Sequence, residues 1–264
     1  MHFPQILGIE CVGIVTDSTE PARIPEGTKI VSIMGEMGRA FDGSYAEYVL
    51  LPNEQIYKVE TNLDWPTMAA VPETYHTAFG TLKNLKIEDS DAVLVRGAAS
   101  GVGVAFAKLL KGKYPEARLY GSTRNTRKAD RLKAAGFDDV VVEKEGRLDT
   151  ALSFDKIADL VGPSAMADSL THLKTVGFSA IPALRRNMDP RRFRHHHRIG
   201  ERQVHYGFYS GLVDEGTLQA LFDLIAEYHI DAGPEKIFSL RDIREAQAYL
   251  DSANSFGKVV VVND

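Results

Sequence analysis

The spacing of apolar positions changes near Pro72. Before it, short apolar segments rich in Val, Ile and Tyr are separated by Gly, Pro, Asp and Asn, and no long helical periodicity occurs. This pattern is typical of a β-rich module. The apolar segments are ECVGIV (10–15), TKIVSIM (28–34), GSYAEYVLLP (43–52) and EQIYKV (54–59).

After Pro72, strand and helix candidates alternate. Repeated β-α-β units predict a parallel sheet that right-handed crossover helices cover on both faces. We therefore expect an α/β fold with a doubly wound sheet of the Rossmann type. The strand candidates are DAVLVRG (91–97), ARLYGST (117–123), DDVVVE (138–143), FDKIADLVG (154–162) and TVGFSA (175–180), and the intervening helices are expected up to Leu110, at 127–135 and at 165–173.

The segment 185–198 interrupts this pattern with six arginines and the adjacent His195, His196 and His197. Such a run cannot be a core element, and a solvated basic loop is the simplest interpretation. An apolar strand follows from Val204 to Ser210. Two helices, at 217–228 and 241–250, then precede a last strand, GKVVVV.

Composition and charge narrow the possible functions. Of the 264 residues, 44% are hydrophobic and 25% are charged, as in ordinary folded proteins. The formal net charge of −5 opposes broad binding to nucleic acid or to an anionic membrane. Cys11 is the only cysteine, which predicts a cytoplasmic protein without disulfides. We expect neither a membrane span nor a secretory signal.

The stretch VLVRGAASGVGVAFAKLL (93–110) joins an apolar strand to a helix through a glycine-rich turn. We expect the helix to begin near Val102, so that the N–H groups of Ser100, Gly101 and Val102 face a phosphate. Without a Cβ, Gly101 and Gly103 let a pyrophosphate approach the backbone and let the helix pack tightly on the strand. The spacing departs from G-x-G-x-x-G, so a tight turn without a ligand is the alternative.

A second signal follows the next strand, where enzymes that use NAD usually carry an acidic residue about 20 residues beyond the glycines. Here the chain reads GSTRN (121–125), with no carboxylate. Ser122, Thr123, Arg124 and Lys128 are candidate ligands of a 2′-phosphate. Two charge-assisted hydrogen bonds, each worth about 1.5–3 kcal/mol, would favour NADPH over NADH. The alternative is that Arg124 and Lys128 are ordinary solvated charges.

Seven blocks of sequence, spread over nearly the whole chain, carry a family resemblance. They are FPQILGIECVGIV, GRAFDGSYAEYVLLP, AAVPETYHTAFGTL, VLVRGAASGVG, STRNTRKADRLKAAGFDDVV, FDKIADLVGPSAMADSLTHLKTVG and GKVVVV. Together they resemble the zinc-independent quinone oxidoreductase branch of the medium-chain dehydrogenase/reductase superfamily. The resemblance implies a partial GroES-like β-barrel domain, expected at 1–72 and 222–264, beside a Rossmann domain at 73–221, with NADPH bound between them.

Three departures from the family pattern bear on function. Ile9 stands where zinc-dependent relatives have a histidine ligand, and the chain has no cysteine cluster, so we expect no metal site. Relatives have a leading segment before the block that begins at Pro4. We expect this segment to be missing here, which puts catalytic competence in question. The basic loop 185–198 replaces a partly apolar lid, and it is either a solvated loop or an attractor of anions.

The resemblance implies reduction of a quinone or an α,β-unsaturated carbonyl by hydride transfer from NADPH. In PETYHTAF, Thr77 resembles the family threonine near the nicotinamide, and Tyr75 is the candidate hydrogen-bond donor to the developing enolate. The alternative for Tyr75 is a buried aromatic side chain whose hydroxyl has a partner. We expect Tyr45 and Tyr48 to pack in the barrel, and Glu10 to be a structural carboxylate.

A non-catalytic protein that binds NADPH, has lost part of its active site and acts through an interaction surface is the competing hypothesis. The missing leading segment and the arginine-rich loop favour it. The strand from Val204 to Ser210 resembles the strand through which Rossmann domains of this family pair, and it predicts a homodimer. Besides a small-molecule carbonyl or quinone substrate and a second copy of the chain, we expect no membrane or nucleic-acid partner.

Overall fold

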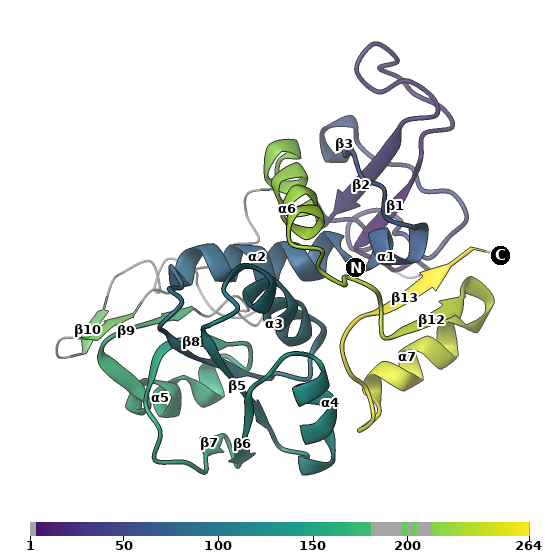
Figure 1. Ribbon diagram of the computed structural model, residues 1–264. Coiled ribbons are helices and arrows are strands. Elements are labelled where there is room, and N and C mark those ends of the chain that lie inside the picture. Colours follow the sequence, from purple (N-terminus) through teal and green to yellow (C-terminus); the bar gives the residue numbers. More distant parts are fainter. Residues whose placement is uncertain (1–3, 181–196, 200–201, 205–212, 264) are drawn as a thin grey trace. The chain divides into compact units, whose positions relative to one another are not determined.

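The computed structural model describes residues 4–180, 197–199, 202–204 and 213–263 (Figure 1). The chain divides into two compact units, one formed by residues 1–76 and 213–264 and the other by residues 77–212. Helix α2 (Pro72–Leu85) carries the chain from the first unit into the second. The expected domain boundaries stay a prediction; the one at 221/222 falls within α6 (Glu215–Glu227), all of which lies in the first unit.

The second unit contains a six-stranded sheet. Its strands are β4 (Ala92–Arg96), β5 (Arg118–Thr123), β6 (Asp139–Lys144), β7 (Arg147–Leu148), β8 (Phe154–Asp159) and β9 (Leu173–Ala180). Their order is β7-β6-β5-β4-β8-β9, and all neighbours pair in parallel except the antiparallel edge pair β6–β7. Numbered along the chain without β7, the order is 3-2-1-4-5, as in doubly wound dinucleotide-binding sheets. The predicted α/β fold class is confirmed.

Crossover helices connect these strands: α3 (Gly101–Lys113), α4 (Ala129–Ala134) and α5 (Pro163–Thr171). Strand β4 is buried from Val93 to Arg96, as expected for the centre of a parallel sheet covered on both faces. The helix expected at 127–135 is a 3-10 turn, η2 (Thr126–Lys128), followed by the shorter α4. One apolar cluster spans the sheet and comprises Leu94, Tyr120, Val141, Leu148, Phe154, Ile157 and Leu173.

The first unit contains an antiparallel sheet with the order β1-β2-β3, formed by β1 (Glu10–Ile14), β2 (Lys29–Ile33) and β3 (Tyr57–Lys58). A separate parallel pair joins β12 (Lys236–Ser239) to β13 (Val259–Val262). The remaining elements are α1 (Trp65–Ala70), α6, α7 (Ile243–Asp251) and the 3-10 turns η1 (Asn53–Gln55) and η4 (Leu240–Asp242). Val15, Ile24 and Ile30 form a small core beside the antiparallel sheet.

One of the four apolar segments assigned to the β-rich module, 43–52, does not form a strand. No strand covers these residues, all of which the structure describes. Instead, the N–H groups of Gly43 and Tyr45 donate to the carbonyls of Ile6 and Leu7, both at 2.9 Å. A Cβ at Gly43 would lie 2.6 Å from the Leu7 oxygen, so the two segments lie too close for a regular pleated ladder with side chains. The contact with residues 6 and 7 therefore takes the place of a strand in this apolar segment.

Tyr48 is 76% exposed, so the expected packing of this side chain is also wrong. Tyr45 is half-buried, and its hydroxyl accepts a hydrogen bond from Gln247 Nε2 at 2.9 Å. The exposure of Tyr48 follows from the loss of the strand, because residues in an irregular segment do not alternate between a core face and solvent.

The strand predicted from Val204 to Ser210 lies largely outside the described residues. Strand β11 (Arg202–Val204), which pairs with β10 (His197–Ile199), ends where the prediction begins. His195 and His196 also lie outside the described residues.

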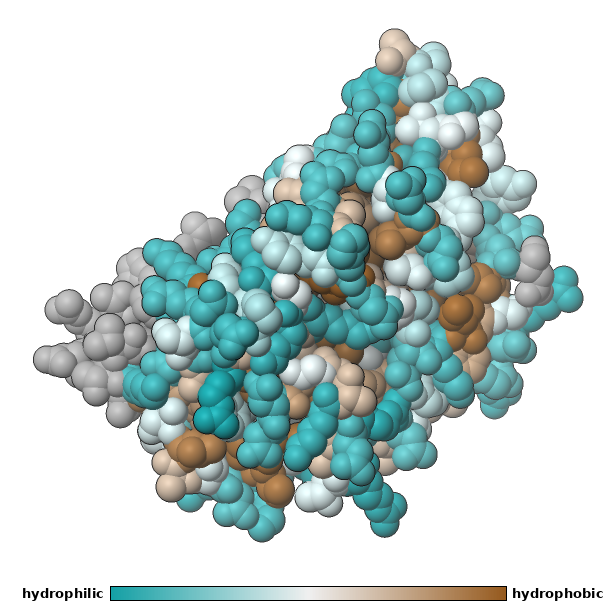
Figure 2. Space-filling model, viewed as in Figure 1, coloured by the Kyte–Doolittle hydropathy of each residue, from teal (hydrophilic) through white to brown (hydrophobic). Residues whose placement is uncertain are grey.

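On the face that Figure 2 shows, hydrophilic residues predominate and apolar residues form smaller patches. Within the described ranges, no helix has both the length and the apolar character needed to cross a bilayer.

Asp214 caps helix α6. Its carboxylate accepts hydrogen bonds from the Thr217 N–H at 2.7 Å and from the Thr217 hydroxyl at 2.8 Å. These bonds from Thr217 hold the pKa of Asp214 below its ordinary value of 3.8. The folded state therefore favours the ionised carboxylate, which is the better acceptor at a helix start.

Replacing Asp214 with Ala should lower the free energy of unfolding by about 1 kcal/mol at pH 7, because the cap is lost. Asp214→Asn keeps the acceptor and should cost less. Since folding lowers the pKa of Asp214, its stabilisation is present above the unfolded-state pKa and is lost as the pH falls through the folded-state pKa. Thermal unfolding of the three proteins, followed by circular dichroism at pH 7 and below pH 3.8, measures this. An Asp214→Ala deficit that stays constant in acid would contradict it.

Candidate cofactor site

The glycine-rich turn leads from β4 into α3. Gly97, the first residue after β4, has a φ of +74°, a left-handed conformation that glycine adopts without strain. Ser100 caps the helix: its Oγ accepts a hydrogen bond from the Gly103 N–H at 3.1 Å, and its carbonyl accepts one from Val104 at 3.0 Å. Helix α3 thus begins at Gly101, close to the predicted start.

Two glycines let the turn, the helix and the neighbouring strand approach one another. A Cβ at Gly103 would lie 2.5 Å from the Ala98 oxygen and 2.8 Å from the Gly97 oxygen, both backbone atoms. A Cβ at Gly121, in β5, would lie 2.9 Å from the Ala98 Cβ and 2.8 Å from the Phe137 ring. A side chain at either glycine would therefore push α3 or β5 away from the turn.

The first turn of α3 presents two N–H groups that helix geometry leaves without an intrahelical acceptor, those of Gly101 and Val102. Both residues are half-buried. The Ser100 N–H, which we expected to face a ligand, instead donates to the Gly97 carbonyl at 3.0 Å. With the positive end of a 13-residue helix behind them, the Gly101 and Val102 groups have the arrangement that binds phosphate.

Ser122 and Thr123 lie at the end of β5, next to the turn, and their hydroxyls are engaged within the protein. Ser122 is 1% exposed; its Oγ donates to Glu143 Oε2 at 2.9 Å and accepts from the Gly97 N–H at 3.4 Å. Thr123 Oγ1 donates to the Asn125 carbonyl and accepts from the Asn125 N–H, both at 3.1 Å. These contacts fit a role in supporting the turns better than direct contact with a ligand.

Arg124 and Lys128 follow Thr123 into η2. Arg124 is exposed and Lys128 is half-buried. Burial lowers the pKa of the Lys128 ammonium, and the positive charges of Arg131 and Arg124 lower it further. The charges of Arg131 and Arg124 therefore each repel the Lys128 ammonium, and an anion bound beside Lys128 would relieve this repulsion. Sequence reasoning found Arg124 and Lys128 but not Arg131, which lies three residues after Lys128.

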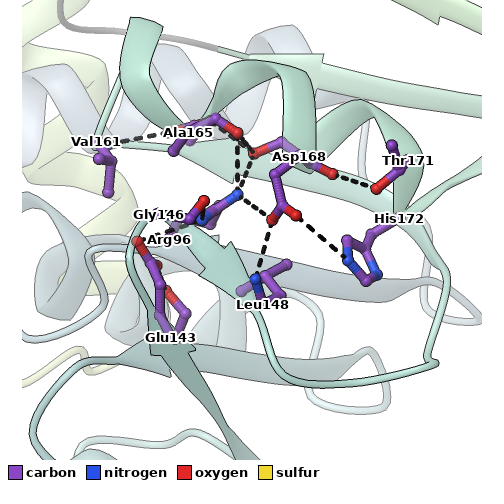
Figure 3. A network of polar contacts seen from close by, with 12 residues as sticks. Arg96, Glu143, Gly146, Leu148, Val161, Ala165, Asp168, Thr171 and His172 are labelled. Carbon is purple, nitrogen blue, oxygen red and sulfur yellow. Dashed lines mark hydrogen bonds and ion pairs between the residues drawn. The ribbon is translucent and has the colours of Figure 1, made fainter.

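A buried polar cluster surrounds the residue that directly precedes the turn (Figure 3). Its centre is Arg96, the last residue of β4, whose side chain is fully buried. The guanidinium forms ion pairs with Glu143 (Nη2 to Oε1, 3.2 Å) and Asp168 (Nη1 to Oδ2, 2.9 Å). It also donates to the Gly146 carbonyl at 2.9 Å and to the Ala165 carbonyl at 3.0 Å.

A second layer of contacts completes the cluster. Ser169 Oγ accepts from Arg96 Nη1 at 3.0 Å and donates to Asp159 Oδ2 at 2.7 Å. Asp168 Oδ2 also accepts the Leu148 N–H at 3.0 Å, and His172 Nε2 lies 4.0 Å from Asp168 Oδ1. Sequence reasoning missed this cluster. The available signal was a charged residue at the last position of an otherwise apolar, central strand.

Tyr75 and Thr77 both lie on α2. Tyr75 is 2% exposed, and burial raises the pKa of its phenol, with a smaller contribution from the charge of Asp231. The phenol therefore stays protonated at neutral pH. Thr77 is half-buried, and its carbonyl accepts a hydrogen bond from the Thr81 hydroxyl at 2.8 Å. Side chains two positions apart on a helix do not share a face, so one face of α2 does not present both.

Glu10 lies in an ion pair of the first unit. Its carboxylate accepts the Glu73 N–H at 2.8 Å and pairs with the Lys258 ammonium, which also donates to the Thr74 hydroxyl at 3.0 Å. These contacts tie β1 to the start of α2 and to the segment before β13, which fits the expected structural role of Glu10.

Among the described residues, no three His, Cys, Asp or Glu side chains are grouped so as to hold a metal ion. The expected absence of a metal site stays a prediction.

Comparison with known proteins tests the family resemblance. A family model described as a zinc-binding dehydrogenase matches residues 135–261. The chain is 29% identical to YhfP of Bacillus subtilis (strain 168) over 193 residues, which cover 69% of this chain and 57% of YhfP. It is 26% identical to 2-methylene-furan-3-one reductase of Solanum lycopersicum over 266 residues, 98% of this chain and 64% of that protein. The resemblance to the medium-chain dehydrogenases/reductases is confirmed.

The chain thus spans less than two thirds of the length of these two relatives. Over a shorter stretch of 80 residues it is 36% identical to quinone oxidoreductase of Homo sapiens, which covers 30% of this chain and 22% of that protein.

Solved structures share the fold of this chain. B. subtilis YhfP with NAD bound has a TM-score of 0.80 and 22% identity, covering 98% of this chain and 82% of YhfP. E. coli K-12 YhdH with bound NADPH has a TM-score of 0.79 and 18% identity, covering 99% of this chain and 83% of YhdH. At these identities the likeness establishes the fold.

Gly103→Ala should lower the free energy of unfolding by about 1–3 kcal/mol, because the new methyl group would overlap backbone atoms of the turn. Gly13→Ala is the matched control, since a Cβ there would meet no atom within 4 Å. Urea denaturation followed by circular dichroism measures both. Equal stability of the Gly103→Ala protein and the unmodified protein would show that α3 does not need this close approach.

Proposed function

We propose that this chain is a zinc-independent, NADPH-dependent oxidoreductase that reduces a quinone or an α,β-unsaturated carbonyl by hydride transfer. The observation that carries the proposal is the turn from β4 into α3. The N–H groups of Gly101 and Val102 are available for a pyrophosphate, and Gly103 removes the side chain that would keep α3 away from the turn. The strand order, with this turn at the first strand, supports the same assignment.

The preference for NADPH is supported by the cations that follow β5. Arg124 and Lys128 come after the second strand of the sheet, where the ribose of a dinucleotide would lie. The chain has no carboxylate at 121–125 to bind an unmodified ribose. The solved structures do not distinguish between the two cofactors, because YhdH was solved with NADPH and YhfP with NAD. The local charge favours the phosphorylated cofactor.

The class of substrate is supported by two relatives, whose names are 2-methylene-furan-3-one reductase and quinone oxidoreductase. When bound, the nicotinamide would supply the hydride. The protein would supply a hydrogen bond to the oxygen on which negative charge develops. Tyr75 is our candidate donor because its phenol hydroxyl is protonated at neutral pH and can donate a hydrogen bond. The assignments of Thr77 to the nicotinamide side and of the chain to a homodimer remain part of this proposal.

Replacing Arg124 or Lys128 with Ala should weaken NADPH binding by about 10- to 100-fold, because each charge-assisted hydrogen bond contributes about 1.5–3 kcal/mol. The affinity for NADH should change by less than about twofold, since NADH has no 2′-phosphate. Lys144→Ala, which removes an exposed cation paired with Asp149, is the control. Fluorescence or calorimetric titration measures these affinities. If the unmodified protein binds both nucleotides equally, the assignment of NADPH is wrong.

Tyr75→Phe should lower kcat by about 100-fold or more on a quinone or enone that the unmodified protein reduces, because the transition state loses a hydrogen-bond donor. The affinity for NADPH should stay the same. Tyr48→Phe removes a hydroxyl from an exposed ring and serves as the control. Oxidation of NADPH, followed at 340 nm with a panel of quinones and enones, measures the rate. Binding of NADPH without turnover on any substrate would favour the non-catalytic alternative.

A further inference from the structure

The buried guanidinium of Arg96 lies beside the glycine turn and is connected to it. We propose that Arg96 is a positioning residue that holds the turn 97–100 in the conformation that accepts the pyrophosphate, acting through Glu143 and Ser122. The inference rests on the proposed cofactor site. It assigns to that site a buried residue that would not itself touch the ligand.

A closed ring of contacts joins Arg96 to the turn. Arg96 Nη2 lies 3.2 Å from Glu143 Oε1, the other oxygen of Glu143 accepts from the Ser122 hydroxyl at 2.9 Å, and Ser122 Oγ accepts the Gly97 N–H at 3.4 Å. Gly97 is the next residue after Arg96, so the ring returns to the backbone where it began. It therefore restrains the orientation of the peptide group at which the chain enters its left-handed conformation.

On its other side, the guanidinium is fixed by α5 and by the β6–β7 hairpin. Nη1 donates to Asp168 Oδ2 and to the Ala165 carbonyl on α5, and Nη2 donates to the Gly146 carbonyl in the hairpin. Asp168 also accepts the Leu148 N–H, which joins the two anchors to each other. The planar fork of arginine can satisfy both directions at once, whereas the single ammonium of lysine cannot.

Burying these charged groups costs free energy, so a contribution to stability does not by itself explain the cluster. The carboxylates of Glu143 and Asp168 pair with one guanidinium, and a third carboxylate, that of Asp159, is joined to it through Ser169. Arg96 Nε is buried and has no hydrogen-bond partner among the described residues. Buried ion pairs are often replaced by apolar residues without loss of stability, so an unpaired buried donor calls for another explanation. A requirement for a fixed turn geometry supplies one.

Ser122 allows two roles to be distinguished: positioning of the turn, and direct contact with the 2′-phosphate, which the sequence suggested for this residue. As a ligand of the 2′-phosphate, Ser122 would contribute to NADPH binding and not to NADH binding. As a link between Glu143 and Gly97, it would contribute equally to both, because both nucleotides contain the pyrophosphate. Adenosine 2′-monophosphate lacks the pyrophosphate and would therefore not depend on the link.

The test measures the affinities of the unmodified protein, Arg96→Lys and Ser122→Ala for NADPH, NADH and adenosine 2′-monophosphate. We expect each variant to bind NADPH and NADH about tenfold or more weakly. The ratio of the two affinities, and the affinity for adenosine 2′-monophosphate, should be unchanged. Ser122→Ala removes one oxygen atom and decides the outcome if Arg96→Lys does not fold.

Leu173→Ala is the control for lost stability, since Leu173 is a buried core residue of the same sheet. It should lower the melting temperature and leave all three affinities unchanged. The positioning role is overturned if both test variants bind like the unmodified protein. It is also overturned if Leu173→Ala loses affinity in the same proportion, or if Ser122→Ala changes the ratio of NADPH to NADH affinity. An unmodified protein that binds neither dinucleotide overturns the proposed function as well.

Discussion

The close approach of α3 to the end of β4 is the constraint on which the second unit depends. At Gly103 the helix backbone lies so near the carbonyls of residues 97 and 98 that no side chain fits between them. Gly121 allows the same closeness between β5 and the turn. Because the turn is held between a helix and a neighbouring strand, its N–H groups keep fixed directions. A fixed array of N–H groups is what a phosphate site requires.

The strand order creates a second constraint. Strand β4 lies between β5 and β8, at the point where the order of strands reverses. A residue at the carboxyl end of β4 is therefore surrounded by elements from both halves of the sheet. Arg96 occupies this position, and its partners come from β6, the β6–β7 hairpin and α5. Removing one partner of such a buried pair typically costs about 3–5 kcal/mol, so the halves of the sheet are coupled through one side chain.

In the proposed function, two separate parts of the second unit would recognise two parts of one cofactor. The uncharged turn before α3 would bind the pyrophosphate through backbone groups. The cationic segment after β5 would distinguish a phosphorylated from an unmodified ribose through side chains. The two parts are joined by Ser122, which contacts Gly97 and lies two residues before Arg124. Side chains can change the preference of such a site without disturbing the backbone that binds the common part.

Local patterns in the sequence determined much of the fold. Apolar strands, the helix start expected near Val102 and the glycines of the turn depend on near neighbours, so the alternation of β and α elements and the candidate phosphate site were readable. The same local reasoning failed at 43–52, where contact with residues 6 and 7 replaces a regular strand. The roles of Ser122 and Arg96 were decided only by the tertiary structure. Arg96 and Asp168 are 72 residues apart, and only the order of the strands brings these buried charges together.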